Sequence, residues 1–332
     1  MKRISLILLL ALLLPAVLVS CSPKTKDASG RCKQDKYVYL VVGFDEAAEN
    51  TDVIFTMSYD AKTNTAYVAQ IPRDTYYRFG SGQNKINQLY ATLVSEGKSS
   101  KEALRITSEK IAELFGTKFD GFIGVTVDTF KSVVDSIGGL DIELNDDMTL
   151  YLEEEDPIIL KKGKNHIDGE RAASFVRFRR GYVMGDLGRI DAQKMFLNAL
   201  FWKLADGVSL PLMFKLANAF QNKIIANIKL LDILALYIDA TNSKYEKKVC
   251  YVTVPGEPTL NSSGISFYVL NRKSAAEIAN KYMYASNPFD SAQLCKNINE
   301  PGFALIYDDN SIGYREYTNE NLSDLKIIQK IN

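Results

Sequence analysis

The chain of 332 residues contains a single histidine, His166, and only four cysteines. A Ser-His-Asp or Cys-His mechanism, or a histidine-rich zinc site, would have to depend on that one histidine. It lies in the segment KGKNHIDGE, whose glycines and asparagine predict a turn. The cysteines also lack CxxC spacing, which argues against a cysteine-based metal site. The sequence therefore disfavours these enzyme and metal-site classes.

Net charge is absent as well, because lysine plus arginine and aspartate plus glutamate both number 40. A protein that binds nucleic acid usually has an excess of positive charge, so we expect no nucleic-acid partner. The apolar content of 46% and the charged content of 24% are ordinary for a folded globular protein. Any site for an anion must therefore be a local cluster of basic residues.

The N-terminus has the features of a secretory signal: two basic residues, an apolar run over 4–19, and the tetrapeptide LVSC ending at Cys21. This ending resembles a bacterial lipobox, in which Cys21 is lipidated and becomes the first residue of the mature protein. The alternative is an uncleaved anchor, because the apolar run is nearly long enough to span a membrane. We favour the lipid anchor. Both interpretations place the remaining chain at the extracytoplasmic face of the cytoplasmic membrane.

Three cysteines remain after Cys21. Outside the membrane, Cys250 and Cys295 would form a disulfide that ties the C-terminal region together, with Cys32 near the anchor. Three buried thiols are the alternative. Neither interpretation bears on catalysis.

The organisation of the chain predicts one α/β domain over residues 37–284, preceded by a signal or anchor (1–21) and a polar linker (22–36), and followed by an extension (285–332). Strands are expected at YVYLVVGF, VIFTMSYD, TAYVAQI, FDGFIGVTV, LDIEL, VCYVTVP and GFALIY. Helices are expected over 86–94, 99–115, 128–137, 210–220, 224–240 and 274–284. Asp128 is the expected cap of the third helix. Alternating strands and helices indicate an α/β layered fold around a largely buried sheet.

The segment FVRFRRGYVMGDLGRIDAQ, residues 175–193, is the most informative part of the sequence. On extended backbone, Arg177 and Arg179 would project to the same side and Phe178 to the other. The next three polar residues have helical spacing and share one face with an apolar stripe; they are Asp186, Arg189 and Gln193, followed by Leu197, Leu200 and Leu204. Polar residues leading into such a stripe predict the rim of a pocket. A solvated cluster of surface ion pairs is the alternative.

Further charged residues lie near strand ends, where α/β folds bind ligands. Asp45 follows the first strand and Asp52 precedes the next, so the two carboxylates are candidates for a magnesium site. Asp52 capping a turn is the alternative. Arg73 comes after Pro72, which ends a strand, and Lys85 lies just ahead of an apolar helix.

Together these residues suggest phosphoryl transfer. Its transition state spreads negative charge over phosphate oxygens, so catalysis depends mainly on positioning and on cations. Arginines match the geometry of phosphate, and a carboxylate pair would hold the metal. The residues alone identify no general base; Asp74 is one candidate, and Asp45 or Asp52 are others.

The motifs GFD…TDVIFTMSYD, AQIPRDT, NKIN, FDGFIGV, VDSIGGLDIEL, DGERAASFVRFRR and DLGRIDAQ follow one another in this order. In this respect the chain resembles the LytR–CpsA–Psr (LCP) family over roughly residues 37–283. The resemblance implies a three-layer α/β/α sandwich with a central mixed β-sheet. It also implies a phosphotransferase that moves a glycopolymer, such as teichoic acid or capsule, from a polyprenyl-diphosphate carrier to peptidoglycan, usually to the C6 hydroxyl of muramic acid. An apolar cavity in this fold takes the prenyl chain.

The resemblance assigns roles residue by residue. It implies that Mg²⁺ binds to Asp45 and Asp52, and that Asp186 is the acidic partner of the arginines. Catalysis would involve Arg73, Arg177, Arg179, Asp186 and Arg189. The diphosphate would bind to Arg73, Lys85, Arg177, Arg179, Arg189 and Gln193.

Two positions depart from the family pattern. Asn50 stands where the family often has arginine, and Ala192 stands where it commonly has arginine before glutamine. We expect both departures to weaken a positively charged rim. Two other functions use the same residues: hydrolysis of a polyprenyl diphosphate, and binding of envelope polymers without catalysis. The carboxylate pair favours an enzyme, because anion binding alone does not need it.

Overall fold

The structure is a computed structural model that describes residues 36–47, 49–80, 82–150, 157–179, 182–207, 220, 223–228, 243, 245–285, 313–318, 321–322 and 325. The predicted anchor with Cys21, the linker, Cys32 and Cys295 lie outside these residues. So do most of the helix predicted over 210–220 and the strand predicted at GFALIY.

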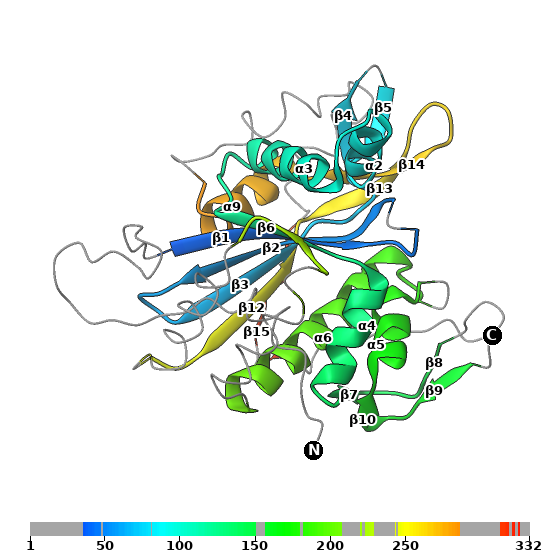
Figure 1. Ribbon diagram of the computed structural model, residues 1–332, viewed down its shortest axis with the longest axis vertical. Helices are drawn as coiled ribbons and strands as arrows, with labels where there is room; N and C mark the ends of the chain where they lie inside the picture. The colour runs from blue at the N-terminus through cyan, green and yellow to red at the C-terminus, as the bar shows by residue number, and fades with distance from the viewer. Residues whose placement is uncertain are drawn as a thin grey trace.

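A mixed sheet of seven strands forms the centre of the molecule (Figure 1). In spatial order its strands are β11 (Ile225–Ala226), β6 (Gly121–Val125), β1 (Lys36–Phe44), β2 (Thr51–Asp60), β3 (Thr65–Gln70), β12 (Lys248–Thr253) and β15 (Tyr317–Thr318). Strands β1, β2 and β3 form an antiparallel meander, whereas β6 pairs with β1 and β12 pairs with β3 in parallel.

Strand β1 illustrates how the sheet separates two hydrophobic cores. Successive side chains of a strand point to opposite faces. Accordingly, Val41 packs into one core, while Leu40 and Val42 pack into the other. All three are nearly inaccessible to solvent, which agrees with the continuous apolar run in the sequence.

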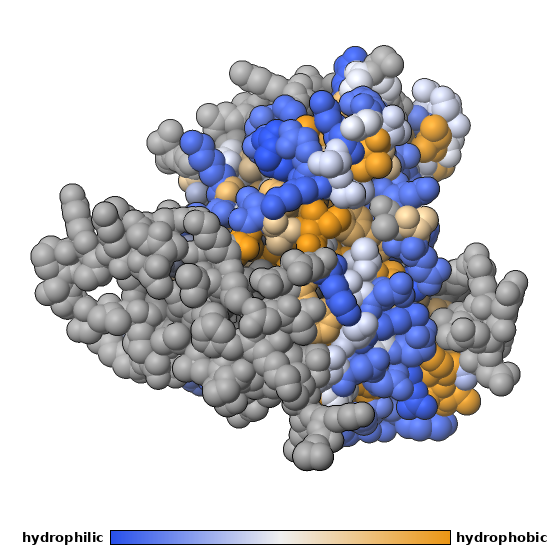
Figure 2. Space-filling model, viewed as in Figure 1, coloured by the Kyte–Doolittle hydropathy of each residue, from blue (hydrophilic) through white to orange (hydrophobic). Residues whose placement is uncertain are grey.

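Helices cover both faces of the sheet (Figure 1). On the face of Leu40 and Val42 the cover is α2 (Gln88–Ser95), α3 (Ser100–Leu114) and α9 (Arg272–Tyr282). On the face of Val41 it is α4 (Val127–Ser136), α5 (Gly169–Arg177) and α6 (Asp186–Gly207). Figure 2 shows hydrophilic residues over α3 and over α4 and α5, with an apolar band between them. This arrangement confirms the predicted three-layer α/β/α sandwich.

Four small antiparallel pairs of strands lie outside the central sheet. They are β4 (Tyr76–Phe79) with β5 (Gly82–Lys85), β7 (Leu140–Leu144) with β10 (Gly163–Ile167), β8 (Met148–Leu150) with β9 (Ile158–Leu160), and β13 (Gly256–Leu260) with β14 (Ser266–Leu270). An isolated bridge joins Thr75 to Tyr268, which attaches β14 beside the segment that contains Arg73 and Asp74. Within the described ranges, no helix is both long and apolar enough to cross a membrane.

Several local predictions were wrong. His166 lies in strand β10 instead of a turn, where its ring bonds the carboxylate of Asp141 at 2.8 Å. Thr126, not Asp128, caps helix α4, because its hydroxyl accepts the N–H of Thr129. The helix predicted over 224–240 begins instead as the short strand β11, which pairs with β6; residues 229–240 lie outside the described part of the chain.

Candidate functional site

The site begins where strands β1 and β2 meet. Gly43 pairs with Val53 and Phe44 with Thr51, so Asp52 is the extra residue of a bulge in β2, at the end of β1 that Asp45 follows. The N–H of Asp45 donates to the carbonyl of Asn50 at 3.0 Å, which closes the loop between the strands. Bulges of this kind redirect side chains and are common next to active sites.

The carboxylate of Asp45 is held by its own loop. Its Oδ1 accepts the backbone N–H of Glu49 at 2.8 Å, and its Oδ2 accepts the amide Nδ2 of Asn50 at 2.9 Å. Asn50 therefore orients Asp45 through both its side chain and its backbone. In place of the cation that the family often has here, this chain has a neutral donor for a carboxylate.

Two carboxylates and two guanidinium groups form a closed set of alternating charges, which we call the charge ring: Asp52, Arg73, Asp186 and Arg189. Arg73 hydrogen-bonds to Asp52, and its Nε lies 3.7 Å from Asp186 Oδ1. Arg189 Nη2 lies 2.8 Å from Asp186 Oδ1, and its Nη1 lies 3.8 Å from Asp52 Oδ2. Each arginine thus faces both carboxylates, and each carboxylate faces both arginines.

The charge ring lies largely inside the protein. The side chain of Arg189 is 4% exposed, against 16–23% for the other three. Burial lowers the pKa of Arg189. Burial acts in the same direction on Arg73, but Asp52 and Asp186 outweigh it, so the pKa of Arg73 is raised. For Arg189 burial thus outweighs the two carboxylates, whereas for Arg73 the carboxylates outweigh burial.

The buried polar atoms of the ring are incompletely satisfied. Within the described residues, Nε of Arg73, Nε of Arg189 and both carboxylate oxygens of Asp186 have no hydrogen-bond partner of good geometry. Buried polar groups are nearly always hydrogen-bonded, so such exceptions call for an explanation. Unsatisfied guanidinium donors are what an anion with several oxygens would satisfy.

Arg177 and Arg179 reach the site differently from our prediction. Phe175 to Arg177 form the last turn of helix α5, so the backbone is extended only at Phe178. Phe178 is buried in the core, and the two arginines still face the site. Arg177 Nη1 donates to Glu46 Oε1 at 2.7 Å, whereas the half-exposed Arg179 has its Nε 3.9 Å from Asp186.

Helix α5 carries a local signal that could have revealed it. Asp168 caps the helix, because its Oδ1 accepts the N–H of Arg171 at 2.9 Å. Aspartate is a preferred residue at the N-cap of a helix, so Asp168 is a sequence signal for the start of α5.

Helix α6 brings the remaining residues together as the spacing predicted. Asp186, Arg189 and Gln193 share its first turns, and Leu200 and Leu204 are buried further along. The amide of Gln193 is itself buried: Nε2 donates to the carbonyl of Val176 at 3.0 Å, and Oε1 accepts from Gln70 at 3.2 Å. Gln193 thus ties α6 to the end of α5, next to Arg177.

Lys85 and Asp74 form the outer edge of the site. The ammonium group of Lys85 lies 3.1 Å from Asp74 Oδ1, and each side chain is 25% exposed. Asp74, a candidate general base from the sequence, therefore already has a cationic partner. Its carbonyl accepts the N–H of Tyr268 at 2.8 Å, which fixes this loop against strand β14.

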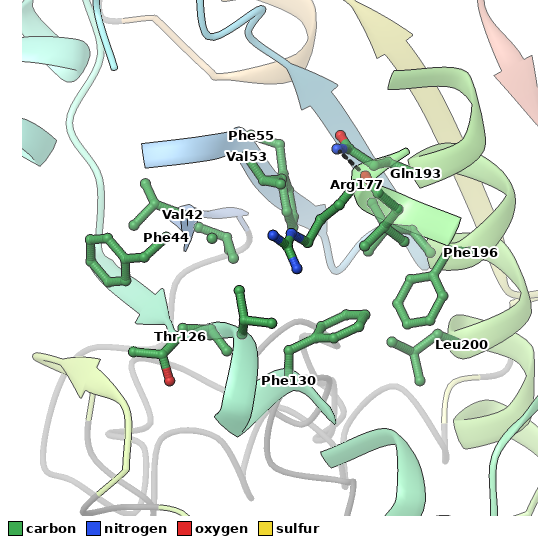
Figure 3. A pocket seen from close by; sticks show the side chains of 16 residues that line it. Val42, Phe44, Val53, Phe55, Thr126, Phe130, Arg177, Gln193, Phe196 and Leu200 are labelled. Carbon is green, nitrogen blue, oxygen red and sulfur yellow. Dashed lines mark hydrogen bonds between the residues drawn. The ribbon is translucent and has the colours of Figure 1, made fainter. Parts of the chain in front are cut away.

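An apolar cavity of about 90 Å³ opens beside the charged residues, between the sheet and the helix layer of α4 and α6. Its walls are almost entirely hydrophobic and include Val53, Phe55, Phe130, Phe196, Leu197 and Leu200. Arg177 and Gln193 are its polar lining residues, apart from Thr126. Figure 3 shows the guanidinium of Arg177 pointing into the space between Val53 and Phe130. The cavity, which we call the tunnel, is therefore lined by apolar side chains together with the cationic Arg177.

The donor set fits Mg²⁺. Among the residues that the structure describes, no three His, Cys, Asp or Glu side chains gather to form a metal cage. Mg²⁺ does not need one, since it takes one or two carboxylates and completes its shell with waters and substrate phosphate. Asp45 follows β1 and Asp52 lies in the adjacent start of β2, and ionised carboxylates retain acceptor sites beyond their present bonds.

The charges of the site balance in the described part of the chain. The cations are Arg73, Lys85, Arg177, Arg179 and Arg189, and the carboxylates are Asp45, Glu46, Asp52, Asp74 and Asp186. Among these ten side chains the charges cancel, so an added cation or the displacement of a carboxylate would favour the binding of a diphosphate.

Comparison with known proteins identifies the family. The model of the LytR_cpsA_psr family matches residues 19–283. The chain belongs to this family. Among characterised relatives, it is 27% identical over 267 residues to the polyisoprenyl-teichoic acid–peptidoglycan teichoic acid transferase TagV of Bacillus subtilis (strain 168); the match covers 71% of this chain and 66% of TagV. It is 25% identical over 257 residues to TagU of Bacillus mycoides (strain KBAB4), a transferase of the same description, covering 75% and 78%.

Solved structures show the same fold. The crystal structure of B. subtilis TagV has a TM-score of 0.64 at 24% identity, covering 76% of this chain and 98% of that one. A structure of TagT bound to LIIa-WTA has a TM-score of 0.60 at 21% identity, covering 79% and 98%. The family's α/β/α sandwich is thus shared by this chain.

One position that departs from the family pattern, Ala192, is fully buried in the hydrophobic core next to Gln193. Sequence reasoning missed two residues of the site. Glu46 bonds Arg177 from 131 positions away, and Gln70 bonds Gln193 from 123 positions away. No local pattern signals contacts of such separation.

Proposed function

We propose that this family member transfers a glycopolymer from a polyprenyl-diphosphate carrier to peptidoglycan by phosphoryl transfer. The observation that carries the proposal is the charge ring, with its unsatisfied guanidinium donors, together with an apolar cavity whose lining includes Arg177. A lipid-linked diphosphate has matching parts, an apolar chain and an anionic head. The descriptions of TagV and TagU as teichoic acid transferases support this function.

In this mechanism the basic residues bind and orient the diphosphate. Arg73 and Arg189 are fixed by Asp52 and Asp186, so their free donors are preorganised before substrate arrives. Arg177, Arg179 and Lys85 are more exposed and contact the outer phosphate oxygens. Charge that develops on the leaving prenyl phosphate is stabilised by these donors. Gln193 positions the end of α5 and with it Arg177.

Asp45 and Asp52 would hold Mg²⁺, which supplies positive charge to the diphosphate and so overcomes the charge balance of the site. The hydrophobic walls take the first part of the prenyl chain and exclude water from the reacting phosphate. The acceptor is a hydroxyl of peptidoglycan. We place the reaction at the extracytoplasmic face of the cytoplasmic membrane, to which the N-terminal segment, lipidated at Cys21, attaches the protein.

The proposal is tested by incubating the protein with lipid-linked glycan, peptidoglycan fragments and Mg²⁺. Arg179→Ala should reduce transfer by about 10³-fold, the order expected for an arginine that stabilises phosphoryl transfer. Arg171→Ala is the matched control, because Arg171 is an exposed arginine of α5 away from the site. Normal transfer by Arg179→Ala would refute the mechanism.

The same experiment separates transfer from hydrolysis. A transferase forms a sugar-linked product only when peptidoglycan fragments are present, and it releases prenyl phosphate slowly without them. Release of prenyl phosphate at the same rate with and without the acceptor would identify a hydrolase. Binding of the donor without any turnover would identify a non-catalytic binding protein.

A further inference from the structure

Glu46 is an exposed carboxylate paired with Arg177, a residue that lines the cavity, and no role for it follows from the proposed mechanism. Its side chain is 69% exposed, and its Oε1 accepts the Nη1 of Arg177 at 2.7 Å. The pair joins the loop after β1 to the end of α5, elements that are 131 positions apart in sequence. Because Arg177 also lines the cavity, the pair lies beside the cavity.

The ion pairs of the site differ in how easily a ligand can break them. Arg189 and Asp186 are 4% and 18% exposed and 2.8 Å apart, so separating them would leave charges buried without a partner. Lys85 and Asp74 are intermediate, at 25% each. Arg177 and Glu46 are the most exposed of these pairs, and exposed pairs contribute little free energy. A diphosphate would therefore displace Glu46 first.

We propose that Glu46 competes with the diphosphate of the donor for Arg177, and so sets the affinity of the site. This inference rests on the proposed function. Glu46 occupies the guanidinium when no donor is bound, and it leaves when phosphate oxygens take its place. Since cations and carboxylates balance in the described site, displacing Glu46 also frees one positive charge for the substrate.

The test measures binding of inorganic pyrophosphate in the presence of Mg²⁺ by isothermal titration calorimetry at low ionic strength. Glu46→Gln keeps the size of the side chain and removes its charge. It should lower the Kd for pyrophosphate by about two- to fivefold, the factor that corresponds to an exposed ion pair. Glu49→Gln is the matched control, because Glu49 is an exposed glutamate of the same loop that holds Asp45 only through its backbone N–H. It should leave the Kd unchanged.

Introducing Glu46→Gln into the Arg177→Ala variant separates competition for Arg177 from a general effect of charge. Arg177→Ala should weaken pyrophosphate binding, and adding Glu46→Gln to it should give no further change. An equal gain in affinity with and without Arg177 would overturn the inference, as would an unchanged or higher Kd for Glu46→Gln alone. If Arg177→Ala itself binds pyrophosphate normally, the proposed diphosphate site is wrong. The two failures are therefore distinguishable.

Discussion

Individual residues of the site divide into those that hold its shape and those that meet the substrate. Arg189 belongs to both groups, because it is almost fully buried between Asp52 and Asp186 and also has an open Nε donor. Arg179 is half-exposed and lies at the limit of ion-pair distance from Asp186. The two arginines should therefore differ in what their loss does to the folded protein.

Arg189→Ala should lower the free energy of unfolding by about 3 kcal/mol, since it leaves two partly buried carboxylates short of a cation. Arg179→Ala should leave the free energy of unfolding within about 0.5 kcal/mol of the parent, because surface changes of this kind have small effects. Both should lose transfer. Urea denaturation of the two variants checks the contrast, and equal stabilities would contradict the structural role of the charge ring.

Asn50 offers a second prediction at the level of single residues. Its amide holds Asp45, so Asn50→Ala should raise the Mg²⁺ concentration needed for half-maximal pyrophosphate binding by about tenfold, as expected when the partner of a metal ligand is removed. Titrating Mg²⁺ at fixed pyrophosphate measures this shift. Glu49→Gln retains the backbone N–H to Asp45 and should behave as the parent. An unshifted Asn50→Ala would show that the loop holds Asp45 without the amide.

Among the elements, α5 matters most, because it ends at Arg177 and packs closely on α4. A Cβ added at Gly169 would lie 2.3 Å from the carbonyl oxygen of Lys131 in α4, and 2.9 Å from the Asp135 oxygen that accepts the Gly169 N–H. Gly169→Ala should therefore force the two helices apart and lower the free energy of unfolding by about 2–3 kcal/mol. Gly82→Ala is the control, since its nearest neighbour would be 3.8 Å away. Thermal denaturation of both variants decides the prediction.

The same helix shows where sequence patterns reach their limit. Strands β1, β2 and β3 and helix α3 were predicted because apolar runs, the alternation in β3 and the Ser99 cap are local signals. Helix α5 was not predicted, because the two-residue spacing of Arg177 and Arg179 was interpreted as extended backbone, although Asp168 marks the start of the helix. The hairpin of β13 and β14 was also missed: Pro258 argues against a strand in general, but β13 pairs with β14 alone, and an edge strand tolerates proline.

In the site, too, local features could be predicted from the sequence, whereas contacts between distant segments could not. The charged residues were found from their spacing and their positions at strand ends, and the resemblance to the family then assigned their roles. Their pairing was not predicted beyond Asp186 with an arginine. Glu46 with Arg177, and Gln70 with Gln193, depend on how β1, β3, α5 and α6 meet in the folded molecule.

For the molecule as a whole, the cavity links the sheet to the helix layer and requires both. Its walls come from β1, β2 and β6 on one side and from α4 and α6 on the other. A change inside the tunnel should therefore act on the lipid part of the donor and leave the charge ring unchanged. Leu197 suits this purpose, because it lines the cavity and is only partly buried.

Leu197→Trp should fill part of the cavity and raise the KM for a long-chain polyprenyl-diphosphate donor by about tenfold or more. The reason is that each buried methylene of the chain contributes about 0.8 kcal/mol, so excluding two of them already gives this factor. A donor with a short prenyl chain should be affected much less, and the Kd for pyrophosphate should stay the same because the charge ring lies outside the tunnel. Steady-state kinetics with donors of two chain lengths measures the difference. Equal effects on both donors would mean that the tunnel does not hold the lipid, whereas a change in pyrophosphate binding would mean that the tryptophan disturbs the site itself.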